Sequence, residues 1–140
     1  MEGVKDTARA LVRIDYGGRV LKTFRGHQAK ERFENEALVL RHLEKQGCSF
    51  VPKVLETDPS KLLLITTYCG KPLERLSEAK LKSLFSDLES FGVRHDDQAM
   101  RNVTYSTQQG RFFLIDFEFA SLFNDPNHHP PEMMPQEETP

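Results

Sequence analysis

A polar loop near residue 100 contains the side chains best suited to carry out chemistry. It includes His95 and Asp97, and Asn102 follows Asp97 after four intervening residues. Asp116 lies fourteen residues beyond Asn102, at the end of an apolar run. Phosphoryl transfer needs Mg²⁺ held by carboxylate or amide oxygens, and a group that takes the proton of the acceptor hydroxyl. The order and spacing of these residues therefore predict this chemistry. The alternative is a solvated loop whose side chains cap backbone amides.

A lysine and a glutamate upstream are expected to form an ion pair. Lys22 alternates with Val20 and Phe24, so it shares a strand face with two apolar side chains. Glu36 lies within the apolar stripe of a helix, where a carboxylate needs a partner or a shifted pKa. Glu34 is the rival for this pairing, but it falls off the stripe. For Lys22, the alternative is that its ammonium extends to solvent.

The elements that must position these residues follow from hydrophobic periodicity. Alternation predicts a hairpin of strands 10–14 and 20–24, and helical spacing predicts a helix over 28–46 that Gly47 ends. Strands are expected at 53–57 and 62–68, and a second hairpin at 103–115. Ser77 is the expected N-cap of a second helix that Gly92 ends. The fold class predicted by this order is α+β.

Two segments resemble a known family. Residues 97–103, Asp-Gln-Ala-Met-Arg-Asn-Val, are similar to the catalytic loop of tyrosine kinases, which also carries Ala and Arg at these places. Residues 114–120, Leu-Ile-Asp-Phe-Glu-Phe-Ala, resemble the choline-kinase form of the metal-binding segment, where Glu replaces the glycine of Asp-Phe-Gly. The chain thus resembles the protein-kinase-like superfamily. This implies a small antiparallel sheet with one helix, followed by a truncated C-terminal lobe of one helix and a hairpin.

The resemblance also implies roles for the polar loop residues. Asp97 would be the catalytic base, and Asn102 and Asp116 would be Mg²⁺ ligands. His95 would brace the loop, and Arg101 would belong to the catalytic loop beside Asp97. The implied cofactors are ATP and Mg²⁺.

The upstream residues would bind the nucleotide. By resemblance, Lys22 would pair with Glu36 and contact the α- and β-phosphates. Residues 65–70 resemble the hinge where adenine hydrogen-bonds to backbone, which makes Thr66 and Tyr68 cofactor-binding candidates.

The sequence departs from the family at the phosphate-binding loop. The family places a first strand and a glycine-rich loop before the strand at 10–14, where only residues 1–9 are available. No Gly-x-Gly-x-x-Gly is present, although Gly3 could be a remnant of it. We therefore expect most of the backbone amides that would hold the phosphates to be missing.

The second departure lies after Asp116, where the substrate-binding helices of a kinase would follow. We expect a minimal domain over residues 1–124 and a disordered acidic, proline-rich tail over 125–140 that folding does not need. A homodimer or a partner protein is expected to cover apolar side chains left exposed by the missing lobe. These side chains are Phe112, Phe113, Phe119 and Leu122.

Composition limits the classes of partner. A net charge of −2 gives no reason to expect nucleic acid or an anionic membrane, and no apolar run is long enough to span a bilayer. Two cysteines are too few for a secreted disulfide framework, so both are expected to be buried and the compartment to be cytoplasmic. The histidines at 27, 42, 128 and 129 lack partners at zinc-ligand spacing.

Two functions remain open at this point. The first is an ATP-dependent phosphotransferase acting on a hydroxyl of a protein or a small molecule. The second is a pseudokinase-like module that senses nucleotide or binds a partner without catalysis. A third possibility is an unrelated α+β scaffold.

Overall fold

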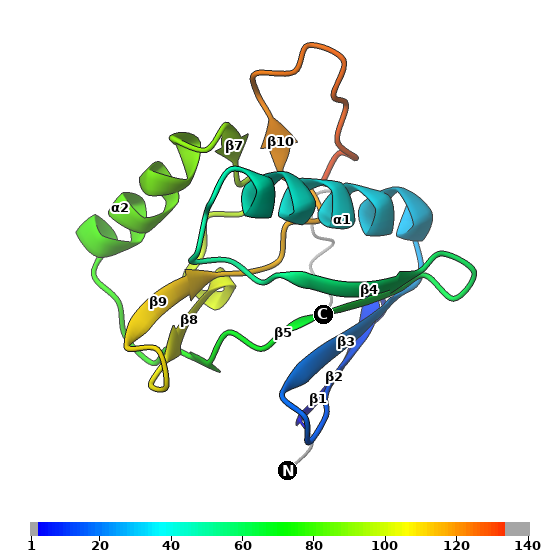
Figure 1. The fold of residues 1–140 in the computed structure, drawn as a ribbon, viewed down its shortest axis with the longest axis horizontal. Helices are drawn as coiled ribbons and strands as arrows, with labels where there is room; N and C mark the ends of the chain where they lie inside the picture. The colour runs from blue at the N-terminus through cyan, green and yellow to red at the C-terminus, as the bar shows by residue number, and fades with distance from the viewer. Residues whose placement is uncertain (1–2, 134–140) are drawn as a thin grey trace, which may run out of the picture.

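A five-stranded antiparallel sheet forms the first part of the computed structural model, which describes residues 3–133. The strands follow the spatial order β1-β2-β3-β5-β4. Their bounds are β1 Gly3–Asp6, β2 Ala10–Ile14, β3 Arg19–Phe24, β4 Val54–Asp58 and β5 Leu63–Thr67. Helix α1, Ala29–Lys45, crosses one face of this sheet (Figure 1). The predicted hairpin, helix and strands are all present, with bounds shifted by one or two residues.

The second part of the fold is smaller and follows β5. It contains helix α2, a three-stranded sheet in the order β6-β8-β9, and the short pair β7 and β10 (Figure 1). The bounds are β6 Lys71–Pro72, α2 Glu78–Glu89, β7 Val93–Arg94, β8 Val103–Ser106, β9 Arg111–Leu114 and β10 Ser121–Leu122. Ser77 caps α2 as predicted, because its hydroxyl accepts a hydrogen bond from the Lys80 amide at 3.1 Å.

The first strand of the sheet corrects one expectation. Gly3 was considered a possible remnant of the family's glycine-rich loop, but β1 pairs with β2 over its whole length, from Gly3 opposite Ile14 to Asp6 opposite Leu11. Gly3 therefore lies at the far end of this hairpin and is no remnant of a phosphate-binding loop. The sequence concealed β1 because its apolar content is a single exposed valine, Val4, so backbone hydrogen bonds form the strand without an apolar face.

The hydrophobic core joins the two parts. Phe33, Leu40 and Leu43 on α1 belong to the same buried cluster as Phe85 and Leu88 on α2. Both cysteines are buried and free, as expected. The second part therefore has no separate core, and α1 lies between the sheet and α2 (Figure 1).

The apolar side chains expected to be exposed are mostly buried. Phe113, Phe119 and Leu122 retain 4%, 8% and 9% of their accessible surface, and Phe112 is half-buried. Expecting exposure was wrong because Leu122 joins the core cluster, Phe112 packs against that cluster, and Arg111 and Arg9 lie over the rings of Phe113 and Phe119. The homodimer or covering partner stays a prediction, but these residues no longer argue for it.

Residues 124–133 leave β10 and return along α1. The imidazole of His128 accepts a hydrogen bond from the Leu122 amide at 3.1 Å and lies 2.7 Å from the Asn35 side-chain oxygen. His128 is thus tied to the folded chain, although it was expected in a disordered tail. Residues 134–140 of that tail lie outside the described residues. Among residues 3–133, no helix has the length and apolar character required to cross a bilayer.

Candidate nucleotide and metal site

Lys22 and Glu36 form the predicted ion pair. The Lys22 ammonium lies 2.9 Å from a Glu36 carboxylate oxygen, and only 13% of the lysine side chain is exposed. Glu34, the rival for this role, is exposed on the other side of α1. Helical spacing correctly predicted Glu36 rather than Glu34 as the partner of Lys22, because a carboxylate within the buried stripe must reach a charge partner. The second Glu36 oxygen accepts a hydrogen bond from the Phe117 amide at 2.8 Å, which ties α1 to the segment after β9.

Two further carboxylates share the same ammonium. Glu118 lies 2.8 Å and Asp116 lies 3.4 Å from the lysine nitrogen. One oxygen from each of Glu36, Asp116 and Glu118 lies within 4.8 Å of the others, a spacing that could hold a cation. The Lys22 ammonium already contacts all three, so lysine is the cation that neutralises this cluster.

Glu118 and Arg32 are site residues that the sequence analysis did not identify. The Arg32 guanidinium is 2% exposed and donates to Glu118 at 2.6 Å. It also donates to the backbone oxygens of His27 and Arg25. The signal for Glu118 was a charged residue inside the buried apolar run 117–120. The signal for Arg32 was its place one turn before Glu36 on the same helix face.

This network sets the protonation states of the cluster. Burial alone would lower the pKa of Lys22, but the carboxylates of Asp116, Glu36 and Glu118 raise it well above its ordinary value. Burial would raise the pKa of Asp116, but the adjacent Lys22 ammonium holds that pKa well below its usual range. Asp116 is therefore ionised and able to bind a cation.

His95 fixes the geometry of the predicted catalytic loop. Its Nδ1 accepts a hydrogen bond from the Asp97 amide at 3.0 Å, and its Nε2 lies 2.9 Å from the Ile115 carbonyl oxygen. These partners require a neutral imidazole protonated on Nε2, and burial lowers the pKa of His95 accordingly. The rings of Phe85 and Phe117 pack edge-on against it. His95 thus joins the loop to the segment that follows β9 and carries Asp116.

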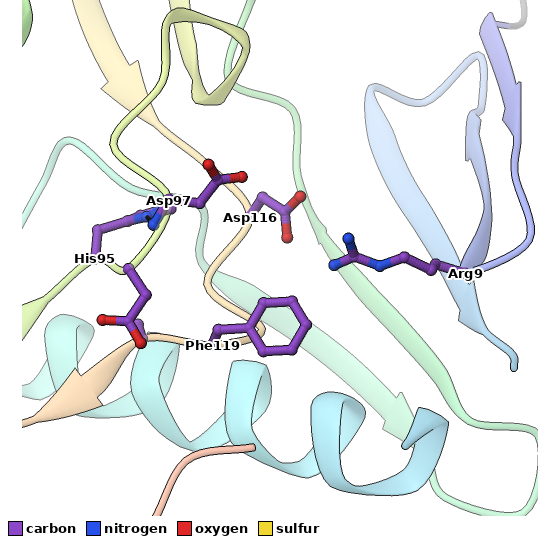
Figure 2. A pocket seen from close by; sticks show the side chains of 7 residues that line it. Arg9, His95, Asp97, Asp116 and Phe119 are labelled. Carbon is purple, nitrogen blue, oxygen red and sulfur yellow. Dashed lines mark hydrogen bonds between the residues drawn. The ribbon is translucent and has the colours of Figure 1, made fainter. Parts of the chain in front are cut away.

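Asp97 and Asp116 face the same small pocket. Arg9, His95 and Phe119 also line it, and Figure 2 shows Asp116 between Asp97 on one side and Arg9 on the other. Asp116 has a positive φ of 67°, a left-handed conformation that costs energy for a residue with a side chain. About a third of its side chain, 36%, stays exposed, so the carboxylate is accessible from the pocket.

The carboxylate of Asp97 is already paired within the loop. Arg101 donates to both of its oxygens, at 2.7 and 2.5 Å. Asn102 donates to the Asp97 backbone oxygen at 2.8 Å and to its carboxylate at 3.1 Å. These bonds use both amide hydrogens of Asn102, which leaves its side-chain oxygen as the atom that could bind a metal. The Ile115 amide donates to the Asn102 carbonyl at 2.9 Å, so the two predicted metal ligands lie on directly bonded segments.

The predicted hinge residues lie at the end of β5. Thr66 pairs with Val20 and Leu64 pairs with Lys22, so the Thr66 side chain shares the sheet face of the lysine. Tyr68 follows the strand and is half-buried. The next carbonyl, that of Cys69, accepts a 2.5 Å hydrogen bond from the Thr104 hydroxyl. This bond fixes the connection between the two parts of the fold.

No protein-family profile and no curated protein matches the sequence. Solved structures do match. The Rio2 kinase–ADP/Mg²⁺–phosphoaspartate complex from Chaetomium thermophilum superimposes with a TM-score of 0.60 at 16% identity, over 89% of this chain and 49% of that chain. A choline/ethanolamine kinase family protein from Mesorhizobium loti gives a TM-score of 0.54 at 15% identity, over 86% of this chain and 58% of that chain.

Both matched proteins are kinases, and this chain spans about half the length of each. At this level of identity the likeness establishes the architecture. The chain has the protein-kinase-like fold.

Proposed function

We propose that this chain is an ATP-dependent phosphotransferase that moves the γ-phosphoryl group of a Mg²⁺-bound nucleotide to a hydroxyl group. The observation that carries the proposal is the pocket in which Asp97 and Asp116 face each other, with the Lys22–Glu36 ion pair adjoining Asp116. The Rio2 structure matched by the fold is a complex with ADP and Mg²⁺. This is consistent with the same ligands binding here.

The donor atoms fit a magnesium ion. Asp116 is ionised and one-third exposed toward the pocket, and the Asn102 side-chain oxygen is left over after both amide hydrogens are bonded. A carboxylate and an amide oxygen are hard ligands suited to Mg²⁺, which completes its shell with phosphate oxygens and water. When bound, the metal would neutralise charge on the phosphates.

The residues of the chain would then divide the work of transfer. Lys22 would keep Asp116 ionised beside the phosphates, and Asp97 would orient the acceptor hydroxyl and take its proton. The acceptor oxygen forms a bond to the γ-phosphorus as the bond from that phosphorus to the β–γ bridging oxygen breaks. ADP leaves, and the acceptor proton goes to the Asp97 carboxylate.

A second function, nucleotide sensing without catalysis, is favoured by one observation. Arg101 donates to both oxygens of Asp97 and so occupies the atoms that would take the proton of the acceptor hydroxyl. For phosphoryl transfer to proceed, Arg101 must move away from the Asp97 carboxylate, or the acceptor hydroxyl must displace it. Arg101 is exposed, so its displacement requires no rearrangement of the core.

A titration of the full chain separates these functions. We expect ATP binding by calorimetry that weakens when EDTA replaces Mg²⁺, and radiolabel transfer from ATP to the chain itself, to added alcohols or to water. Binding with no transfer to any acceptor supports the sensing function. Absence of binding with and without Mg²⁺ contradicts both functions.

A further inference from the structure

The turn between β1 and β2 lies where a kinase-like fold places its phosphate-binding loop, yet three of its backbone amides are already used. The Thr7 hydroxyl oxygen accepts hydrogen bonds from the amides of Arg9 and Ala10 at 3.3 and 3.2 Å. The Thr7 amide donates to the Ala10 carbonyl at 3.0 Å. An anion cradle needs backbone amides that point outward without partners. This turn therefore offers a phosphate little from its backbone.

Contacts from Arg25 and Arg32 also hold this turn in place. The Arg25 guanidinium donates to the Thr7 carbonyl at 2.6 and 2.8 Å and contacts Asp6. The Arg9 carbonyl accepts from the Arg25 amide at 2.9 Å and from the Arg32 guanidinium at 3.3 Å. At Gly26 the backbone has a φ of +79°, and an added Cβ would lie 2.7 Å from the Ala8 carbonyl oxygen. These contacts fix the position from which the Arg9 side chain extends.

From this fixed turn the Arg9 side chain reaches into the pocket of Asp97 and Asp116 (Figure 2). Its guanidinium lies 5.0 Å above the centre of the Phe119 ring and 3.8 Å from a Glu118 oxygen. The contact with Glu118 is too long for a hydrogen bond of normal length, and 45% of the side chain is exposed. Among the described residues, the Arg9 guanidinium makes no shorter polar contact, so its N–H donors are available to a ligand.

The other cations near the pocket are already engaged. Lys22 is shared by three carboxylates, Arg32 bonds Glu118 and three backbone oxygens, and Arg101 bonds Asp97. A nucleotide would bring several negative charges next to Asp97 and Asp116. Arg9 is the cation placed to offset them, and a guanidinium can bind phosphate oxygens in pairs.

We propose that Arg9 binds the phosphate chain of the nucleotide, so that a side-chain guanidinium on a rigid turn replaces the backbone-amide cradle. This proposal rests on the nucleotide-binding function above and assigns its phosphate contact. Stacking on Phe119 holds the guanidinium in place before the ligand arrives, which lowers the ordering cost of binding. The contact depends on phosphate number, because adenosine offers Arg9 no anionic oxygen.

Calorimetric titration of ATP, ADP, AMP and adenosine into wild type and Arg9→Met tests this assignment. Arg9→Met is expected to weaken ATP binding by about 10- to 100-fold, the usual worth of a hydrogen bond to a charged group. The loss should shrink from ATP to AMP and disappear for adenosine. The ATP affinity of Arg9→Lys should fall between those of wild type and Arg9→Met, because lysine keeps the charge without the paired donors. The matched control is Arg13→Met, an equal charge loss at an exposed position of β2, the strand that follows Arg9, and it should bind like wild type.

Equal weakening of ATP and adenosine by Arg9→Met would show a structural role, and unchanged ATP binding would exclude the phosphate contact. Either result overturns the assignment while wild type still binds ATP. Titration with inorganic tripolyphosphate distinguishes failure of the Arg9 assignment from failure of the proposed nucleotide function. If wild type binds tripolyphosphate through Arg9 but binds no nucleotide, the anion contact stands and the nucleotide function fails. If it binds neither probe, both are wrong.

Discussion

At the scale of single residues, the pocket holds two aspartates to which the proposed function assigns different tasks. Asp116 adjoins Lys22 and faces the pocket as an ionised carboxylate, whereas Asp97 is held on the loop braced by His95. A metal ligand acts already when nucleotide binds, and a base acts when the proton moves. Substitution of each residue should therefore affect different measurements.

Asp97→Asn is expected to leave Mg²⁺-ATP affinity within a few-fold of wild type and to lower phosphoryl transfer by about 10²-fold or more, the usual worth of a positioned base. The reason is that Asn keeps the shape of the side chain and loses the proton acceptor. Calorimetry and a radiolabel transfer assay measure the two quantities. Transfer at the wild-type rate would exclude Asp97 as the base.

Asp116→Asn should instead weaken nucleotide binding in Mg²⁺ and make it insensitive to EDTA. The change removes the charge that would hold the metal beside Lys22. Titrations of wild type and variant, each with Mg²⁺ and with EDTA, give the comparison. A variant that still responds to Mg²⁺ as strongly as wild type would place the metal elsewhere.

Glu118→Gln tests the network that the sequence did not reveal. It leaves the buried guanidinium of Arg32 and the ammonium of Lys22 short of one charge partner, and breaking a buried pair costs about 3–5 kcal/mol of unfolding free energy. Urea denaturation measures this loss. Glu34→Gln is the control, because the same substitution at an exposed position should change stability by about 0.5 kcal/mol or less. Equal effects of both variants would contradict the structural role of Glu118.

At the scale of elements, α1 is the piece to which the rest of the site is tied. Glu36 bonds Lys22 of β3 and the Phe117 amide, and Asn35 donates to the carbonyls of Glu118 and Ala120. His128, from the segment after β10, lies against the oxygen of that same Asn35. This segment therefore helps to hold Asn35 against residues 118–120, which follow Asp116.

Truncation tests that contribution and the predicted boundary at residue 124. A chain ending after residue 130 keeps His128 and should melt like the full chain. A chain ending at residue 124 loses the two hydrogen bonds made by the His128 side chain, about 1–2 kcal/mol, or several degrees of melting temperature for a domain of this size. The melting temperatures of the three chain lengths, measured by calorimetry, show whether residues 125–130 stabilise the fold. Equal melting temperatures would support a tail that folding does not need from residue 125 onward.

The contribution of His128 to the stability of the fold should depend on pH. Its Nδ1 accepts the Leu122 amide, so the folded chain needs the neutral ring, and burial lowers the pKa of His128. Asp125 opposes that shift and His129 adds to it, while Glu31 and Glu34 line the adjoining groove. Because the pKa of His128 is lower in the folded chain than in the unfolded chain, its contribution to stability is fully present above the ordinary histidine pKa of about 6.5. That contribution is lost as pH falls through the pKa of the folded chain.

The gap in melting temperature between wild type and His128→Ala should therefore be largest near neutral pH and should narrow as pH is lowered below about 6.5. Thermal melts at a series of pH values measure it. His42→Ala serves as the control, because the contact of the His42 ring with the Phe91 carbonyl oxygen involves an acceptor and no amide donor. A gap for His128 that is constant with pH would exclude the proposed bonding.

At the scale of the whole molecule, the nucleotide would join the two parts of the fold. Lys22 belongs to the sheet and Asp116 follows β9, so a ligand held by both adds contacts across the connection at residues 68–70. A ligand that binds only the folded state stabilises it by about 2.7 kcal/mol at 100 times its Kd. Mg²⁺-ATP should thus raise the melting temperature of wild type, and Asp116→Asn should lose most of that rise. A rise that persists in the variant would indicate binding outside this pocket.

The amino-acid sequence by itself determined the local elements and their polar exceptions. Apolar periodicity placed α1, α2 and the paired strands, since local patterns fix which face is buried. The same pattern singled out Glu36 over Glu34, because a charge inside an apolar stripe must find a partner. The spacing of Asp97, Asn102 and Asp116 indicated one site.

Tertiary structure decided the features that depend on distant segments. β1 forms only because β2 offers a free edge, and Arg9 enters the pocket only because Arg25 and Arg32 hold its turn. Glu118 finds Arg32 across 86 residues, a contact that no local pattern specifies. Packing after Asp116 likewise buried aromatic side chains that looked exposed. Each of these results depends on the summed geometry of several elements, which is why the folded chain, and not the spacing of its residues, determines them.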